Sequence, residues 1–347
     1  MRPSAGRVAW GATALLLGVG GLLGHRWVAL GWNAARYPVA AGTERSQAVV
    51  LGAFAYLAAG TAGVEVVDLS TSSRVAFVAP VPPLDRVDDL AISEGLLFAL
   101  DATAPGHLTT YSLADPRRPT ASGATVSVPV GPFSGVSAAS GLVVASGGTS
   151  QMTLRSYDPS GAFGVAVAVA DFGRGQPDVA LRVDPAEPLL AAISTHLVGP
   201  DFAITLAEIR RQPLSIVRLS EIPLDGAGFT GGGFKPAHFP IVSAWRGNLL
   251  YVAHGGGLWT IDATDPRSPR VLAQDASLAP AQDLALSRDR LDVLTRSQVV
   301  RFQLDGAGLP SPISRWDLPQ GSPASSIVGF GERLFLTRRE GWQVLSQ

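Results

Sequence analysis

Three aspartates occupy the same position in three similar short segments, and carboxylates in that arrangement could bind a cation. Asp89 opens Asp-Leu-Ala-Ile, Asp178 opens Asp-Val-Ala-Leu and Asp283 opens Asp-Leu-Ala-Leu. If these segments are equivalent strands around one axis, their carboxylate oxygens converge and could hold calcium or a cationic ligand. The alternative is that each aspartate accepts backbone N–H groups where the chain enters its strand. The alternative requires no ligand, and we favour it.

A glycine-rich segment, Leu224–Pro240 (LDGAGFTGGGFKPAHFP), is the second candidate site. It lacks the Gly-Lys-Ser/Thr order of a phosphate-binding loop, because Phe234 precedes Lys235 and Pro236 follows it. Its flexible backbone and aromatic side chains instead predict a loop that contacts a partner or covers a channel. A surface insertion whose phenylalanines pack on neighbouring strands is the other interpretation. The residues that would make the contacts are Phe229, Phe234, Lys235, His238 and Phe239.

The rest of the sequence offers little catalytic chemistry. The chain has no cysteine, and its five histidines are scattered without a metal-binding pair. Ser134 lacks the Gly-x-Ser-x-Gly spacing of a nucleophile elbow. The formal charge is −1, so nothing favours nucleic acid as a partner. A binding protein is therefore favoured over an enzyme, and the enzyme alternative is a hydrolase or lyase with a metal, such as calcium, held by the three aspartates at the mouth of a central channel.

The N-terminus predicts a transmembrane anchor or a signal peptide within residues 1–32. The segment Val8–Gly24 contains no charged residue and is followed by Trp27 and Trp32. As a helix it would be about 26 Å long, near the lower limit for crossing a hydrocarbon core of about 30 Å. Small residues suited to cleavage do not follow it directly. We therefore expect an uncleaved anchor with the remaining chain outside the cytoplasm, in the periplasm or at the cell surface, whereas cleavage would make the protein secreted.

The candidate residues lie within a recurring pattern of apolar strands, spaced 41–47 residues apart with one longer gap of 61 residues. The clearest unit is Pro240–Ala273, where four strands with period-two alternation are separated by turns. Each unit alone would leave its sheet faces exposed, which favours several units closing into a ring. The seven recurring strands are centred on Tyr56, Phe98, Val143, Leu190, Tyr251, Asp292 and Phe335.

The pattern predicts an all-β fold, with residues 47–347 forming a β-propeller of four-stranded blades after one N-terminal hydrophobic helix. We expect seven blades, or six if the divergent middle of the chain is miscounted. Residues 33–46 are expected to be a linker. The last unit, Ser326–Gln347, is one strand short of a blade, and Tyr37–Thr43 could supply the missing strand and join the two ends of the ring.

A common motif recurs most clearly in Tyr251–His254 with Gly256–Asp262, Asp265-Pro266 and Pro269, and more loosely in Tyr56–Ala59, Gly63–Asp68 and Leu113–Pro116 with Pro119. These segments resemble the LVIVD repeat, a β-propeller repeat found in bacterial and archaeal surface proteins. The segment Gly161–His238 does not share the resemblance. The resemblance implies a propeller placed outside the cytoplasm rather than a particular reaction. We therefore expect a membrane-anchored extracytoplasmic scaffold that binds a protein or small ligand.

Overall fold

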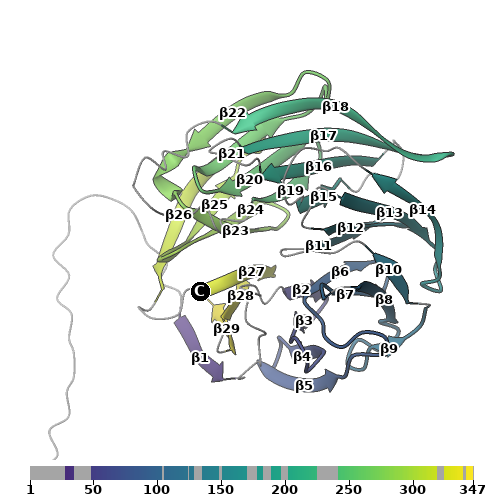
Figure 1. Ribbon diagram of the computed structural model, residues 1–347. Coiled ribbons are helices and arrows are strands. Elements are labelled where there is room, and N and C mark those ends of the chain that lie inside the picture. The colour runs from purple at the N-terminus through teal and green to yellow at the C-terminus, as the bar shows by residue number, and fades with distance from the viewer. Residues whose placement is uncertain are drawn as a thin grey trace, which may run out of the picture.

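The part of the chain that the structure describes is built almost wholly of β-strands and turns. A computed structural model describes residues 28–34, 48–103, 105–123, 125–128, 135–147, 151–169, 178–182, 189–196, 202–224, 241–318, 324–338 and 341–346. Within these residues the strands form seven antiparallel sheets, with one short 3-10 helix, η1 (Ala276–Leu278). Figure 1 shows this arrangement. The prediction of an all-β fold is confirmed.

The sheets are numbered here in chain order, and the first four are built from consecutive strands. Sheet 1 contains β2 (Ala48–Leu51), β3 (Phe54–Ala58), β4 (Val64–Asp68) and β5 (Ser73–Val78). Sheet 2 contains β6 (Asp89–Ser93), β7 (Leu96–Asp101), β8 (Gly106–Ser112), β9 (Thr120–Ala121) and β10 (Val126–Val128). Sheet 3 contains β11 (Gly135–Ala139), β12 (Leu142–Gly147), β13 (Gln151–Tyr157) and β14 (Phe163–Val169). Sheet 4 contains β15 (Asp178–Leu181), β16 (Leu189–His196), β17 (Phe202–Arg211) and β18 (Leu214–Leu224).

The remaining three sheets complete the set, and the last of them takes a strand from the other end of the chain. Sheet 5 contains β19 (Val242–Arg246), β20 (Leu249–His254), β21 (Gly257–Asp262) and β22 (Arg270–Asp275). Sheet 6 contains β23 (Ala281–Leu286), β24 (Arg290–Thr295), β25 (Gln298–Leu304) and β26 (Pro310–Asp317). Sheet 7 contains β27 (Ala324–Phe330), β28 (Arg333–Arg338), β29 (Gly341–Ser346) and β1 (Val28–Ala34).

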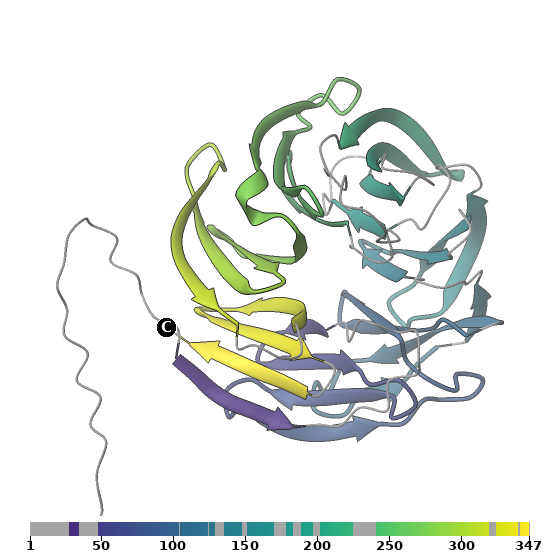
Figure 2. The same ribbon diagram turned by 60° about the vertical axis from the view of Figure 1, so that its left-hand side comes forward.

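The first strand of each sheet packs against the first strand of the next sheet. The contacts run from β2 to β6, β11, β15, β19, β23 and β27, and β27 packs against β2 again. Because this cycle returns to its start, the sheets surround a common axis, as Figures 1 and 2 show from two directions. Several four-stranded antiparallel sheets arranged in this way are consistent with a β-propeller.

Apolar side chains between neighbouring sheets form the core. In β20, Leu250 and Val252 point into the cluster shared with sheet 4, whereas Tyr251 and Ala253 point into the cluster shared with sheet 6. Successive side chains of a strand point to opposite faces, so a strand in the middle of such a sheet must be apolar on both sides. This requirement explains why the second strands read as nearly continuous apolar runs in the sequence.

The strand that completes sheet 7 lies upstream of the range predicted for it. β1 (Val28–Ala34) pairs antiparallel with β29, with Val28 opposite Ser346 and Ala34 opposite Gly341. The predicted closing strand, Tyr37–Thr43, lies outside the described residues. The N-terminal segment therefore does complete the last sheet, but with residues that the sequence assigned to the edge of the apolar segment. An edge strand is held by backbone hydrogen bonds, so its sequence need not carry the apolar run that marks a buried strand.

The hydrophobic helix predicted at residues 8–24 also lies outside the described residues. Among the residues that are described, none belongs to a helix with the length and apolar character needed to span a bilayer.

Candidate functional site

The three candidate aspartates, and the two strands that flank the glycine-rich segment, meet one face of the ring, which we call the connection face. The last strand of each sheet ends on this face and the first strand of the next sheet begins there, for example β22 and β23, with η1 between them. Asp89 and Asp178 are the first residues of β6 and β15, and Asp283 is in the first half of β23. The segment between Leu224, the end of β18, and Val242, the start of β19, also leaves and re-enters the ring on this face.

The opposite face, which we call the hairpin face, carries the tight turns between the first and second strands of the sheets. Such turns join Ser93 to Leu96 in sheet 2 and Phe330 to Arg333 in sheet 7. Because first strands run from the connection face to the hairpin face, the ends of every other strand can be assigned to one face or the other from the pairing registers. The assignment separates candidate binding groups from the turns that shape the sheets.

Asp89 and Asp283 each connect two neighbouring sheets. One oxygen of Asp89 accepts the N–H of Leu90 at 2.7 Å, and the other accepts the N–H of Val136, in β11 of the next sheet, at 2.7 Å. Asp283 repeats this arrangement with Leu284 and with Ile327 in β27, both at 2.8 Å. A carboxylate that accepts backbone N–H groups with both oxygens has a structural task. This geometry agrees with the backbone-binding interpretation of these aspartates.

Asp178 is placed at the start of β15, but its side chain is outside the described part of the structure, as are all five predicted contact residues of the glycine-rich segment. Those five are Phe229, Phe234, Lys235, His238 and Phe239. The structure therefore brings Asp89 and Asp283 to equivalent positions in sheets 2 and 6 without testing the predicted loop. Among the described residues, no three histidines or acidic residues lie together as a metal would require.

A cavity of about 510 Å³ lies between the first strands of five sheets. Aliphatic side chains and backbone form most of its wall, and its polar side chains are Gln282, Asp283 and Ser326. The side-chain oxygen of Gln282 is buried and has no hydrogen-bond partner among the described residues. A cavity of this size can hold a small ligand. The lining residues are Ala48, Val49, Val50, Ile92, Val242, Gln282, Asp283, Leu284, Ala285, Leu286, Ser326, Ile327, Val328 and Gly329.

The connection face also carries buried acidic residues that the sequence did not single out as a group. Asp88 bonds Arg86 at 2.7 Å and accepts the N–H of Ala102 at 2.9 Å, while Asp101 accepts the N–H groups of Asp85 and Thr103. Burial raises the pKa of the Asp88 carboxyl, although Ala102 and Arg86 act in the opposite direction. These carboxylates hold the segment entering β6 against the end of β7, so they are structural rather than open to a ligand.

His254, at the end of β20, is a buried base without an acid partner. Its side chain is 1% exposed, its Nδ1 accepts the N–H of Gly256 at 3.0 Å, and its ring lies edge-on to Trp259. Burial lowers the pKa of His254 to about 4, so the ring is neutral at physiological pH. Its Nε2 has no hydrogen-bond partner among the described residues. The sequence contains no metal-binding histidine motif around it, and among the described residues it belongs to no group that could hold a metal ion.

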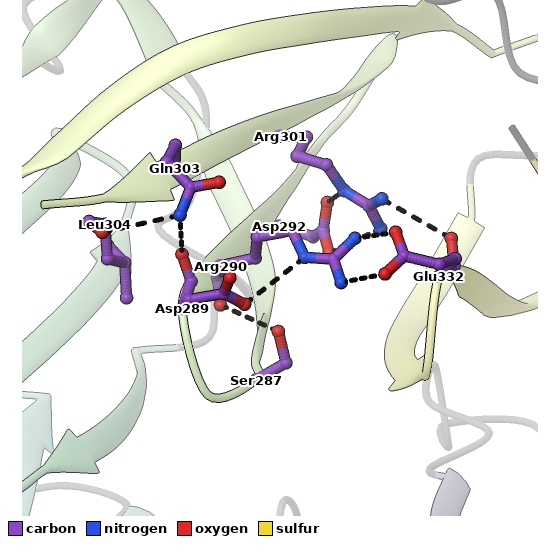
Figure 3. A network of polar contacts seen from close by, with 8 residues as sticks. All are labelled: Ser287, Asp289, Arg290, Asp292, Arg301, Gln303, Leu304 and Glu332. Atoms are coloured by element: carbon purple, nitrogen blue, oxygen red, sulfur yellow. Dashed lines mark hydrogen bonds and ion pairs between the residues drawn. The ribbon is translucent and has the colours of Figure 1, made fainter.

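Charged residues that could suggest catalysis in sheet 6 form an inter-sheet network, drawn in Figure 3. Arg301 donates to both oxygens of Asp292, at 2.7 and 3.1 Å, and both side chains are nearly fully buried. Arg290 forms a bidentate ion pair with Glu332, which lies in the turn of sheet 7. Burial raises the pKa of the Asp292 carboxyl, and Arg301 opposes that shift. The network ties sheet 6 to sheet 7 on the hairpin face, away from the cavity's polar groups.

Glu65 is the most deeply buried carboxylate of the seam between sheets 1 and 7. It is 0% exposed, accepts from Arg74 Nε at 2.5 Å and from the indole N–H of Trp342 at 3.3 Å, and leaves Oε2 without a partner among the described residues. Burial raises its pKa, and Arg74 opposes that shift. The sequence signal that could have revealed it is a carboxylate between two valines, Val64 and Val66, inside a strand rather than at its end.

Comparison with known sequences supports the predicted repeat. The LVIVD repeat model matches residues 46–81 and 244–273, so this resemblance is confirmed, and LVIVD repeats belong to a β-propeller repeat family. The matched segments form most of sheets 1 and 5. In each, the final aspartate of the motif closes the third strand: Asp68 accepts from Ser70, and Asp262 accepts from Thr264. No curated protein matches the chain.

Solved structures resemble the fold at low sequence identity. Chaetomium thermophilum Raptor superimposes with a TM-score of 0.59 and 15% identity over 92% of this chain, which spans 29% of the Raptor chain. A computationally designed protein, Ika8, gives a TM-score of 0.50 and 10% identity, covering 94% of this chain and 98% of the designed one. At these identities the likeness concerns the fold alone.

Proposed function

We propose that this chain is a seven-bladed β-propeller that acts as a binding scaffold, anchored to a membrane through residues 8–24 with the propeller outside the cytoplasm. The observation that carries the proposal is the closed cycle of contacts among the first strands of the seven described sheets. A closed ring buries the faces of sheets that could not stand alone and presents a rigid face of loops. Such a face suits recognition of a partner.

The chemistry of the described residues supports binding over catalysis. Asp89 and Asp283 use both carboxylate oxygens to hold backbone N–H groups, and His254 is neutral and buried. A general acid or base must reach its substrate with a pKa suited to the working pH. Each of these groups instead contacts the protein itself.

The partner would bind on the connection face, where the cavity's polar residues lie and where β18 ends at Leu224 and β19 begins at Val242. Phe234 and Phe239 are the proposed anchors, because aromatic side chains dominate the binding energy of protein interfaces. The cavity is the corresponding place for a small ligand.

Crosslinking in intact cells tests the scaffold. We expect the full-length chain to form a defined crosslinked species that is lost in the double variant Phe234→Ala and Phe239→Ala. Leu309→Ala is the matched control, because Leu309 is a partly exposed apolar residue next to β26 on the hairpin face. Loss in both variants, or in neither, would contradict the proposed contact face.

Fractionation tests the anchor separately. We expect the full-length chain in the membrane fraction and a variant lacking residues 1–24 in the soluble fraction. Protease added outside spheroplasts should digest the propeller of the full-length chain. A full-length chain that stays soluble, or that resists external protease until the membrane is opened, would contradict this part of the proposal.

A further inference from the structure

The direction of β1 fixes which face of the ring the N-terminal segment approaches. Val28 begins β1 opposite Ser346, the last residue of β29. The end of β29 pairs with the start of β28, where Leu345 lies opposite Leu334, next to the turn that joins Phe330 to Arg333. That turn belongs to the hairpin face. The chain therefore enters the ring at the hairpin face of sheet 7 and runs along β1 toward the connection face.

Only three residues separate the apolar segment from this entry point: His25, Arg26 and Trp27 lie between Gly24 and Val28. Even fully extended, the four steps from Gly24 to Val28 span at most about 14 Å. If residues 8–24 cross a membrane, the first residue of β1 must lie within that distance of the hydrocarbon core. The tether is thus too short to let the ring turn its other face to the lipid.

We propose that the hairpin face next to sheet 7 lies against the lipid bilayer and that the connection face points away from it. This inference rests on the membrane anchor proposed above. It places the cavity's polar residues and the ends of the Leu224–Pro240 segment on the far side of the ring, where a soluble partner can reach them. It also makes the outer edge of sheet 7 the part of the propeller closest to the membrane.

The short tether, rather than charge, sets this orientation. On the hairpin face the turns of sheets 6 and 7 carry Arg288 and Arg290, but also Asp289 and Glu332. Arg290 is already paired with Glu332 and approaches Asp289 at 3.5 Å. Paired surface charges attract lipid headgroups weakly, and salt screens what remains. The orientation should therefore be the same on neutral and anionic bilayers.

Fluorescence transfer to the bilayer tests the orientation. The natural chain has no cysteine, so single cysteines can be labelled without removing others. Arg288→Cys and Ser297→Cys form a matched pair, because both are exposed and they flank the two ends of β24 in the same sheet. The six residues of β24 separate these ends by about 17 Å. A donor dye would be attached to each full-length variant in vesicles of phosphatidylcholine whose headgroups carry the acceptor.

We expect stronger transfer from position 288 than from position 297, by roughly twofold or more over this separation. The ratio should persist when phosphatidylglycerol is added to the vesicles. Flotation of the vesicles distinguishes the two ways to fail. A chain that does not float overturns the anchor and the orientation together, whereas a chain that floats with equal or reversed transfer overturns the orientation alone. Unlabelled variants must show the wild-type unfolding midpoint, so that a difference in transfer reports position.

Discussion

At the scale of single residues, the hydrogen-bond partners of a carboxylate determine whether it can bind a ligand or instead holds the backbone. Asp89 and Asp283 stand where converging ligands for calcium were considered, yet their oxygens bind N–H groups of the next sheet. Sequence identifies the residue type and its place at the start of a strand. It does not identify a partner that lies more than forty residues further along the chain, because that contact exists only once the sheets pack side by side.

Replacing Asp89 should weaken the ring. Asp89→Ala leaves the N–H groups of Leu90 and Val136 without their acceptor inside the interface between sheets 2 and 3. We expect the free energy of unfolding to fall by about 2–3 kcal/mol, measured by urea denaturation. Asp317→Ala, an exposed aspartate at the end of β26, should have little effect. Equal losses in the two variants would contradict the inter-sheet role.

Calcium provides an independent test of the same carboxylates. We expect millimolar calcium to leave the unfolding midpoint of the wild-type chain unchanged, because neither Asp89 nor Asp283 has an oxygen free of a backbone N–H bond. A calcium-dependent rise in the midpoint that disappears in Asp283→Asn would instead support the metal site. Calorimetric titration of the same two proteins measures the binding directly.

His254 should make the protein sensitive to mild acid. Its pKa is lowered to about 4 in the folded chain, against an ordinary value of 6.5, so the folded state binds the proton less well than the unfolded state. The stability that depends on neutral His254 is fully present above about pH 6.5 and is lost as the pH falls toward about 4. The total loss in the free energy of unfolding is about 3 kcal/mol. Urea denaturation across this range measures the loss.

The matched variant is His254→Asn, whose side-chain oxygen can accept the N–H of Gly256 in place of Nδ1. Between pH 6.5 and about 4, the free energy of unfolding of this variant should fall less than that of the wild-type chain. If both proteins respond to acid alike, another group carries the response.

At the scale of secondary structure elements, the recurring short apolar runs predicted the buried strands well. The unit Pro240–Ala273 was expected to contain four strands, and β19 to β22 lie there. The divergent middle was harder, because β17 and β18 form a long hairpin of ten and eleven residues that extends the pattern of a typical blade. Strand length depends on how far a partner strand continues alongside, which local alternation does not record.

The misplaced closing strand has a similar physical cause. Val28–Ala34 reads VALGWNA, and its aliphatic and tryptophan residues also suit the border of a membrane segment. Its pairing with β29 is a long-range backbone contact between the two ends of the chain. The number of strands in the last unit indicated that one was missing. Only the pairing seen in the fold shows that residues 28–34 supply it.

Truncation tests the role of β1 as an element. Removing residues 1–24 should leave the unfolding midpoint unchanged, because β1 is retained. Removing residues 1–34 should lower the free energy of unfolding by about 3–5 kcal/mol, since the strand's hydrogen bonds to β29 are lost and that strand becomes an exposed edge. Thermal unfolding of the two truncated chains measures the difference. A chain lacking residues 1–34 that unfolds like the full-length chain would show that β29 does not need this partner.

At the scale of the whole molecule, stability depends on the seam where sheet 7 meets sheet 1. Phe335, Trp342 and Val344 pack into the cluster of β2, β3 and β4, and the guanidinium of Arg333 donates to the backbone oxygen of Leu69 at 3.1 Å. These contacts join residues from opposite ends of the chain. Forming them costs much chain entropy. Once they have formed, every described sheet packs against a neighbouring sheet on both of its faces.

Trp342 should therefore be the residue whose loss opens the ring. Trp342→Ala removes a fully buried side chain and the indole N–H that donates to Glu65. We expect the free energy of unfolding to fall by about 3–5 kcal/mol. Trp342→Phe keeps most of the volume and should cost less, about 1–2 kcal/mol. Trp245→Phe is the matched control, because its indole N–H donates across the interface of sheets 4 and 5 at 3.1 Å. Urea denaturation ranks the three variants.

Hydrogen exchange then locates the opening. In Trp342→Ala the amides of β2 to β4 and of β27 to β29 should lose protection together, because a ring that parts at the seam exposes both of its flanking sheets to water. Trp245→Phe should leave these amides protected, since its interface lies on the other side of the ring. If Trp342→Ala lowers protection evenly in all seven described sheets, the ring unfolds as one unit and the seam has no special role. If only sheet 7 exchanges, the contacts to sheet 1 do not hold the circle closed.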